Sequence, residues 1–155
     1  MISAPGIYIG IGMILSLLAT ETLGVTAGGI IVPGYIAMSI DDPSRLIVTF
    51  GISITTFLII KMLSKFILIY GKRRLVLTLL LGFLLGLFTR FENNFHSYIT
   101  NMDFVVIGNI IPGLIANWMD RQGVLRTISV VLITASITKL LIMLLIAFNI
   151  LNFNV

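Results

Sequence analysis

The chain has 155 residues, of which 58% are hydrophobic and 10% charged, and its mean hydropathy is +1.14. A soluble domain carries about 25% charged residues, so this chain has too few charges to cover its own surface and is predicted to be an integral membrane protein. Cysteine is absent, which excludes disulfides and thiolate metal sites, and the net charge of +4 lies mostly in short connections, which indicates membrane orientation rather than nucleic-acid binding.

The first half is predicted to hold two membrane helices separated by a broken segment. Residues 7–23 form the first helix, which we expect to be retained because no Lys or Arg precedes it, unlike in a signal peptide. Residues 28–40 are apolar, but Pro33-Gly34 should break any helix there, and a segment of that length reaches only about 20 Å. Crossing the hydrocarbon takes about 30 Å. Residues 45–70 form a long helix that leads into a basic loop, residues 71–74.

The second half follows the same plan. Residues 75–89 form another span, and a polar connection covers residues 90–103. Residues 104–119 contain a second Pro-Gly pair, Pro112-Gly113, and residues 124–151 form a final long helix. The halves are therefore predicted to be built alike.

The broken segments also match residue by residue. When residues 29–46 are laid on 108–125, identical residues stand at eight of the eighteen positions, including both Pro-Gly pairs and an Asp at the same distance after each. We predict an all-α integral membrane protein made of an internally duplicated helix–broken helix–helix unit. Residues 1–74 form the first repeat and 75–155 the second, and together they make one membrane domain with four full spans plus two Pro-Gly-interrupted segments. Chance coincidence of apolar residues is the alternative.

The breaks indicate where a site would lie. Backbone groups freed at a break cannot face lipid, so we expect both broken segments to be buried in the protein, packed against each other. Paired broken helices in two halves of a membrane protein point to a site near the midplane. Ordinary kinked helices packed for architecture are the competing interpretation.

Topology depends on whether the broken segments cross the membrane or re-enter. The basic loop at residues 71–74 is expected in the cytoplasm. Crossing places Arg121 and Arg126 on that same side and both termini outside, whereas re-entry places both termini in the cytoplasm and these two arginines outside. Segment length favours re-entry and the charge rule favours crossing. We expect crossing, with the short segments tilted.

Four charged residues fall within or near the predicted spans. Lys61 and Lys139 occupy nearly matching places in the two halves, and a charge at such depth usually faces the protein interior. Both are therefore candidates to bind a partner or ligand. Lys65 lies near a helix end, where its long side chain can reach the interface. Glu21 either reaches the interface or pairs with a lysine.

No catalytic constellation is found. The sequence has no Gly-rich phosphate loop followed by Lys-Ser/Thr, no HExxH and no GxSxG motif. The lone histidine, His96, lies in the polar connection, where no metal cluster can form around it. We predict no catalytic residue, cofactor or metal for the chain alone. Trp118 and Tyr70 fit an interfacial aromatic belt.

Three runs of the sequence resemble the CapC/PgsC family. They are ETLGVTAGGIIVPGY (21–35), LSKFILIYGKRR (63–74) and IIPGLIANWMDRQG (110–123). That family comprises small membrane subunits of bacterial poly-gamma-glutamate capsule synthesis. The resemblance implies a multi-pass protein of the bacterial cytoplasmic membrane. It also implies two partners: an ATP-dependent amide ligase of Mur-ligase character (CapB/PgsB) and a membrane-anchored CapA/PgsA protein.

The resemblance carries functional positions onto this chain, although Ala27 stands where some members have proline. The positions are Glu21, Gly24, Gly29, Pro33, Gly34, Tyr35, Lys65, Tyr70, Gly71, Arg73, Pro112, Gly113, Asn117, Gln122 and Gly123. Combined with the charge pattern, the candidate residues for binding polymer or partner are Glu21, Pro33, Gly34, Tyr35, Lys61, Lys65, Arg73, Pro112, Gly113, Asn117, Asp120 and Lys139.

The function that this resemblance implies is a non-catalytic membrane subunit that supports the ligase and forms part of a conduit for the polymer. Polyglutamate is a polyanion, so lysines and the positive ends of helices that start at the breaks would lower the cost of bringing it near lipid. An autonomous small-molecule or ion transporter is the alternative, because duplicated broken helices are a transporter device. A third reading is a membrane subunit that completes the ligase active site.

Overall fold

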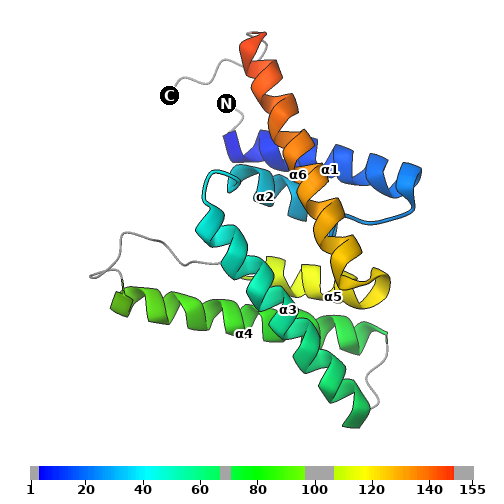
Figure 1. Ribbon diagram of the computed structural model, residues 1–155, viewed down its shortest axis with the longest axis vertical. Helices are drawn as coiled ribbons and strands as arrows, with labels where there is room; N and C mark the ends of the chain where they lie inside the picture. Colours follow the sequence, from blue (N-terminus) through cyan, green and yellow to red (C-terminus); the bar gives the residue numbers. More distant parts are fainter. Residues whose placement is uncertain (1–3, 67–70, 97–106, 149–155) are drawn as a thin grey trace.

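The computed structural model describes residues 4–66, 71–96 and 107–148, which form six α-helices and no β-strand. The helices are α1 Ala4–Leu23, α2 Val32–Met38, α3 Pro43–Phe66, α4 Lys72–His96, α5 Ile111–Gln122 and α6 Val124–Ala147. Figure 1 shows an elongated arrangement in which α1 and α4 run in opposite directions, as do α3 and α6. The predicted all-α class is confirmed.

Three of these helices are long and apolar enough to cross a membrane, namely α1, α3 and α6. They contain most of the predicted spans at residues 7–23, 45–70 and 124–151. The predicted span at residues 75–89 lies inside α4, which is not one of the three. The described part of the chain is therefore helical and has three candidate membrane spans.

Two boundaries near α4 differ from the prediction. The basic run expected in a loop forms the first turn of α4, and the helix continues to His96, so the polar connection starts later than the sequence indicated. The physical reason for the earlier start is that Lys and Arg are good helix formers. Their long side chains can extend from an apolar helix to the polar interface. Tyr70, expected in an aromatic belt, lies outside the described residues.

The interruptions lie before the Pro-Gly pairs rather than at them, which corrects the prediction. α2 and α5 each carry their proline in the first turn, where its missing N–H costs no hydrogen bond. The chain turns into α2 through Gly28 and Gly29, with φ of 68° and 121°, and into α5 through Gly108, with φ of 61°. Glycine adopts these angles without the strain that a Cβ would bring. The Pro-Gly pairs thus start the short helices.

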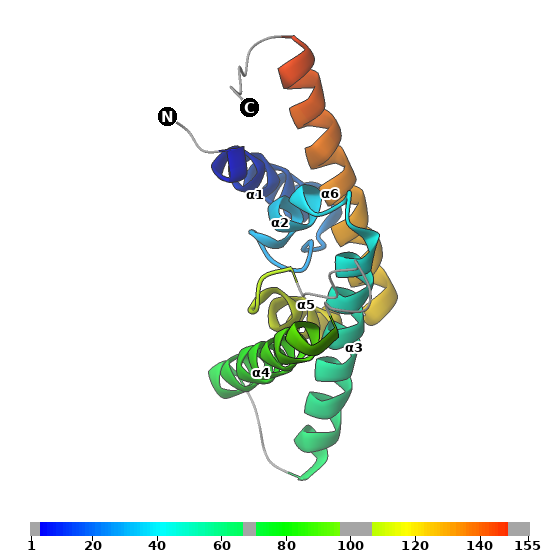
Figure 2. The same cartoon turned by 90° about the vertical axis from the view of Figure 1, so that its left-hand side faces the viewer.

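The helices form two groups of three, and each group contains helices from both halves of the sequence. α1 and α2 pack with α6, and α4 and α5 pack with α3. Figure 1 shows the first group at one end of the molecule and the second at the other, and Figure 2 shows the same division from the side. Each short helix therefore packs against the long helix of the other half of the sequence.

Close approach of backbones holds each group together. An added Cβ on Gly12 of α1 would lie 2.5 Å from the backbone N and Cα of Gly34 in α2. In the other group, a Cβ on Gly82 of α4 would lie 2.5 Å from the backbone N of Gly113 in α5. Because lipid supplies no hydrophobic force between helices, such contacts between small residues drive association. The glycine of each Pro-Gly pair therefore serves packing.

The faces of α3 and α6 that meet the short helices carry buried hydroxyl groups. Each donates to the carbonyl four residues earlier in its own helix, so it is satisfied without a partner from another helix. These residues are Thr49, Ser53 and Thr56 on α3, and Thr127, Thr134 and Thr138 on α6. These six hydroxyl donors are therefore buried without the cost of an unmade hydrogen bond.

Candidate functional site

A groove runs along the junction of the two helix groups. Its larger part is a cavity of about 540 Å³ between the end of α1, the connection to α2 and one face of α5. A smaller cavity of about 240 Å³ shares two of its lining residues and continues toward the start of α5. We call both together the α1–α5 groove. Its lining includes Leu17, Thr20, Glu21, Thr26, Gly29, Ile30, Ile31, Tyr35, Asn109, Leu114 and Trp118.

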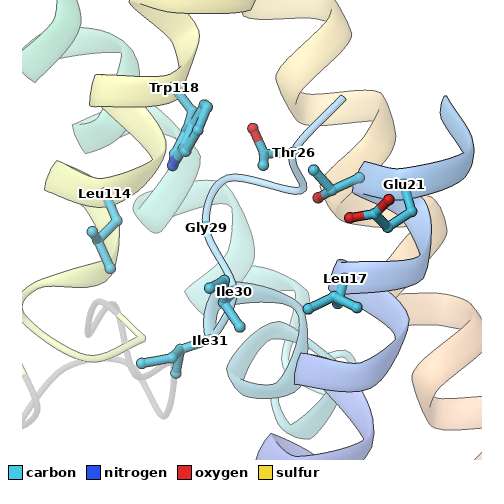
Figure 3. A pocket seen from close by; sticks show the side chains of 9 residues that line it. Leu17, Glu21, Thr26, Gly29, Ile30, Ile31, Leu114 and Trp118 are labelled. Atoms are coloured by element: carbon cyan, nitrogen blue, oxygen red, sulfur yellow. The ribbon is translucent and has the colours of Figure 1, made fainter. Parts of the chain in front are cut away.

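Most of the groove is apolar, with a few polar groups at one end. Figure 3 shows Glu21 on α1 and Trp118 on α5 on opposite sides of it, with Thr26 between them on the connecting segment. Arg121 lies outside the lining, with its guanidinium carbon 5.3 Å from the Trp118 ring centroid, a distance typical of a cation–π contact. Trp118, expected in an aromatic belt, therefore forms one wall of the groove.

Glu21 is exposed and lies two residues before the end of α1. Among the residues that the structure describes, no cation lies within ion-pair distance of its carboxylate. A negative charge at a helix C-terminus is also unfavourable, because it meets the negative end of the helix dipole. Glu21 does not pair with a lysine of its own chain, which was one of the two roles expected for it.

Lys139 is the buried cation of the molecule's first helix group. Its side chain is 10% exposed, and its ammonium group is ion-paired with Asp41, which lies just after α2 and is 79% exposed. The lysine therefore faces the protein interior, as its depth in the sequence indicated, but its charge is already neutralised. The ion pair links α6 to the end of α2, so the ammonium group is not available to a ligand.

Lys61, unlike Lys139, lies at the surface. It is exposed on α3, with its ammonium nitrogen 5.4 Å from the centroid of the Phe57 ring, and Lys65 one turn later is also exposed. Although Lys61 and Lys139 match in the sequence, the structure places only Lys139 in the interior. The two lysines do not meet around the breaks.

Arg74 and Asp120 form an ion pair between the first turn of α4 and the end of α5. Each is about one-quarter exposed, so the pair is partly shielded from water. The neighbouring Arg73 and Arg121 are exposed. Asp120 is thus neutralised by an arginine that the sequence had not singled out, while the charge of Arg73 is available at the surface.

Gln122 ties the connection before α2 to the end of α5. Its Oε1 accepts the backbone N–H of Thr26 at 3.2 Å and the Thr26 hydroxyl at 3.4 Å, and its Nε2 donates to the Thr26 carbonyl at 2.6 Å. Nε2 also donates to the Thr127 hydroxyl oxygen at 3.1 Å. In the other group, the Thr49 hydroxyl oxygen accepts the N–H of Ile107 at 3.0 Å. These bonds satisfy backbone groups freed by both interruptions.

The remaining candidate residues are buried or partly buried among the packed helices. Pro33, Gly34, Pro112, Gly113 and Asn117 are buried, and Tyr35 is partly buried at the smaller cavity. The structure therefore distributes the candidates among the groove, two ion pairs and two packing seams. Within the described ranges, no three His, Asp or Glu side chains gather as metal ligands would.

Sequence reasoning did not single out Arg74, Asp41, Thr26 and Asn109 for a role at the site. The signal for Asp41 was present, since it matches Asp120 in the repeat. The pairing of Thr26 with a glutamine 96 residues away leaves no local pattern. The side-chain oxygen of Asn109 is buried beside the smaller cavity without a hydrogen-bond donor in the described part of the chain.

Comparison with known proteins identifies the family. A family model described as capsule biosynthesis CapC matches residues 11–128, a stretch that includes both interruptions and the whole groove. A capsule biosynthesis protein CapC of Bacillus anthracis is 36% identical over 129 residues, which cover 83% of this chain and 86% of the relative. A PGA biosynthesis protein CapC of Bacillus subtilis (strain 168) is 33% identical over the same shares of both chains. No solved structure matches at a comparable level. The chain therefore belongs to the CapC family of capsule biosynthesis proteins.

Proposed function

We propose that this chain is the membrane subunit of a poly-gamma-glutamate synthesis and export complex, where it supports an ATP-dependent ligase and a membrane-anchored CapA/PgsA-like partner. The observation that carries the proposal is the family match over residues 11–128, which spans both interruptions. Its relatives bear names in capsule and PGA biosynthesis. The chain contributes no catalytic group of its own, and the ligase carries the chemistry.

In the proposed arrangement the short segments cross the bacterial cytoplasmic membrane. The Arg74–Asp120 ion pair supports crossing, because it joins the basic start of α4 to the end of α5. Re-entry would put these two ends on opposite sides of the membrane. The hydrogen bonds between Thr26 and Gln122 bring the end of α1 to the same side. That side collects the exposed basic residues and would face the cytoplasm.

Crossing makes the two halves inverted repeats, with α4 as the fourth full span. The packing supports this part of the proposal, because Gly12 meets Gly34 just as Gly82 meets Gly113. In both halves, the long helix that follows the short helix packs with the other group: α3 with α4 and α5, and α6 with α1 and α2. Domain limits at residues 1–74 and 75–155 follow from this correspondence.

The polymer would bind to exposed basic residues on the proposed cytoplasmic side, which we call the basic face, rather than to the ion-paired residues. Lys139 is already neutralised by Asp41, and Arg74 by Asp120, so neither cation has much charge left to attract a polyanion. The exposed cations on the proposed cytoplasmic side are Lys65, Lys72, Arg73, Arg121 and Arg126. Polyglutamate carboxylates leaving the ligase would be attracted to this face.

A triple variant tests the proposal: Lys72→Gln, Arg73→Gln and Arg121→Gln. We expect the amount of surface polymer to fall severalfold in cells while the tagged chain still copurifies with the ligase. Arg45→Gln, at the other end of the crossing segments, is the control and should leave polymer yield unchanged. An unchanged yield in the triple variant would contradict the role of the basic face, and failure to copurify with any ligase would contradict the complex itself.

Cysteine labelling tests the topology, since the natural chain has no cysteine. A cysteine at Asp42 should react with an impermeant maleimide in intact cells, whereas a cysteine at Arg126 should react only after the membrane is opened. Labelling of both positions in intact cells would refute crossing. The transporter alternative predicts solute uptake by liposomes that contain this chain alone, and such uptake would replace our proposal.

A further inference from the structure

Glu21, near the end of α1, and Lys61, near the end of α3, carry opposite charges, and neither has an ion-pair partner within the described residues. Glu21 sits at the end of α1 with Leu17, Ile30 and Ile31 around it in the groove, all three exposed. Its carboxylate has no cation in reach. Lys61 is exposed on α3, with its ammonium group near the Phe57 ring. Near the hydrocarbon, both charges are costly unless an assembly neutralises them.

The two residues cannot meet within one chain. α1 packs with α2 and α6 in one group, and α3 packs with α4 and α5 in the other. In Figures 1 and 2, α1 lies in the upper part of the molecule, whereas α3 runs from beside α2 down to the lower end, where α3 finishes far from α1. Any ion pair between Glu21 and Lys61 therefore needs a second molecule.

The depth of the two residues is compatible with such a pair. Glu21 lies two residues before the end of α1, and Lys61 lies five residues before the end of α3, so the two stand about 3 and 8 Å from their helix ends. The connection after α1 is bonded to the end of α5, and α3 leads within a few residues to the start of α4, which is also paired with the end of α5. Both charges therefore lie toward the same side of the membrane.

Shape and polarity favour a helix in the groove rather than the polymer. The groove is largely apolar, and its one unpaired charge is negative, so a polyanion would be repelled from it. On α3, Lys61 is flanked on the same face by Leu58 and Met62, both exposed. This face thus offers one cation among apolar side chains, which complements one carboxylate among apolar side chains.

We propose that α3 of a second copy docks in the α1–α5 groove, so that Lys61 of one copy pairs with Glu21 of the next. The contact joins two unlike surfaces and is heterologous, so it can repeat from copy to copy and close into a ring. The occupant is a second copy because the chain supplies both unpaired members of the pair. Lys139, which matches Lys61 in the sequence, needs no such partner because Asp41 neutralises it internally.

Crosslinking between two single-cysteine chains tests the contact directly. Glu21→Cys and Lys61→Cys are placed in differently tagged copies of the otherwise cysteine-free chain, expressed together and oxidised in membranes. We expect a mixed dimer from this pair. The matched control combines Glu21→Cys with Val76→Cys, an exposed position near the start of α4, and should give little product. Equal yields from both combinations would overturn the proposal.

Charge exchange supplies the second measurement, with oligomer mass in mild detergent as the readout. Glu21→Lys or Lys61→Glu alone should weaken association at least about tenfold, because each brings like charges together. The double variant Glu21→Lys/Lys61→Glu should restore it. A natural chain that is monomeric in membranes, or a double variant no better than the single ones, would refute the contact. These readouts need no polymer, so they fail independently of the function proposed above.

Discussion

Replacing Gly12 with alanine would place a methyl group where α1 and α2 touch. The new Cβ would lie 2.5 Å from the N and Cα of Gly34, whereas ordinary contacts start near 3.4 Å. The helices would have to separate by about 1 Å, and neither side can yield by rotating a side chain, because both surfaces are backbone. Overpacking of this kind costs about 1–3 kcal/mol, and we expect the upper part of that range.

Gly10 offers a matched control on the same helix. An added Cβ there meets no atom within 4 Å, so Gly10→Ala should be neutral or slightly stabilising through the better helix propensity of alanine. Gly82→Ala should behave like Gly12→Ala, since its Cβ would meet the backbone of Gly113 at 2.5 Å.

Thermal unfolding in detergent measures the difference. The chain has a single tryptophan, Trp118, which lines the groove and reports on the junction of the two helix groups by its fluorescence. A loss of 2–3 kcal/mol corresponds to a fall in Tm of roughly 5–10 °C for a domain of this size. If Gly12→Ala and Gly82→Ala melted at the same temperature as Gly10→Ala, the close backbone contacts would be refuted.

Further variants probe two polar contacts, the Lys139–Asp41 ion pair and the hydrogen bonds of Gln122. Asp41→Asn should lower the free energy of unfolding by about 1–3 kcal/mol, because it leaves the buried ammonium of Lys139 without its carboxylate. Lys139→Met should cost less, since Asp41 is exposed to water, and the double variant should recover most of the loss; equal costs for both single variants would contradict the burial. Gln122→Glu removes the two N–H donors, so the carboxylate would face the Thr26 carbonyl. Hydrogen exchange at the backbone of the connection before α2 should then accelerate, and unchanged protection would contradict this anchoring role.

Local chemistry made much of the fold predictable. Long apolar runs predict α1, α3 and α6 within a few residues of their observed ends, whereas α4 extends seven residues beyond its predicted end. The Pro-Gly pairs correctly indicated which two segments contain an interruption. They misplaced the interruption because proline is tolerated in the first turn of a helix, while Gly28 and Gly29 make the actual turn at positive φ.

The site was less predictable, because it depends on contacts between distant parts of the chain. Lys61 and Lys139 look alike in the sequence, and only the packing of α6 on α2 separates the buried lysine from the exposed one. Trp118 fits an aromatic belt as well as a groove wall until the position of α1 is known. No periodicity indicates that α3 and α6 exchange partners, since their buried faces carry the same hydroxyl residues.

The exchange of α3 and α6 has a consequence for biosynthesis. α2 buries its Val32 and Ile36 in a core that includes Val131 and Ala135 of α6, which is made after the other described helices. Until that helix is inserted, α2 is covered by α1 but lacks its partner on the α6 side, so part of its packing surface stays open. A message that stops before α6 would therefore yield a product with an uncovered seam, suited to degradation rather than assembly.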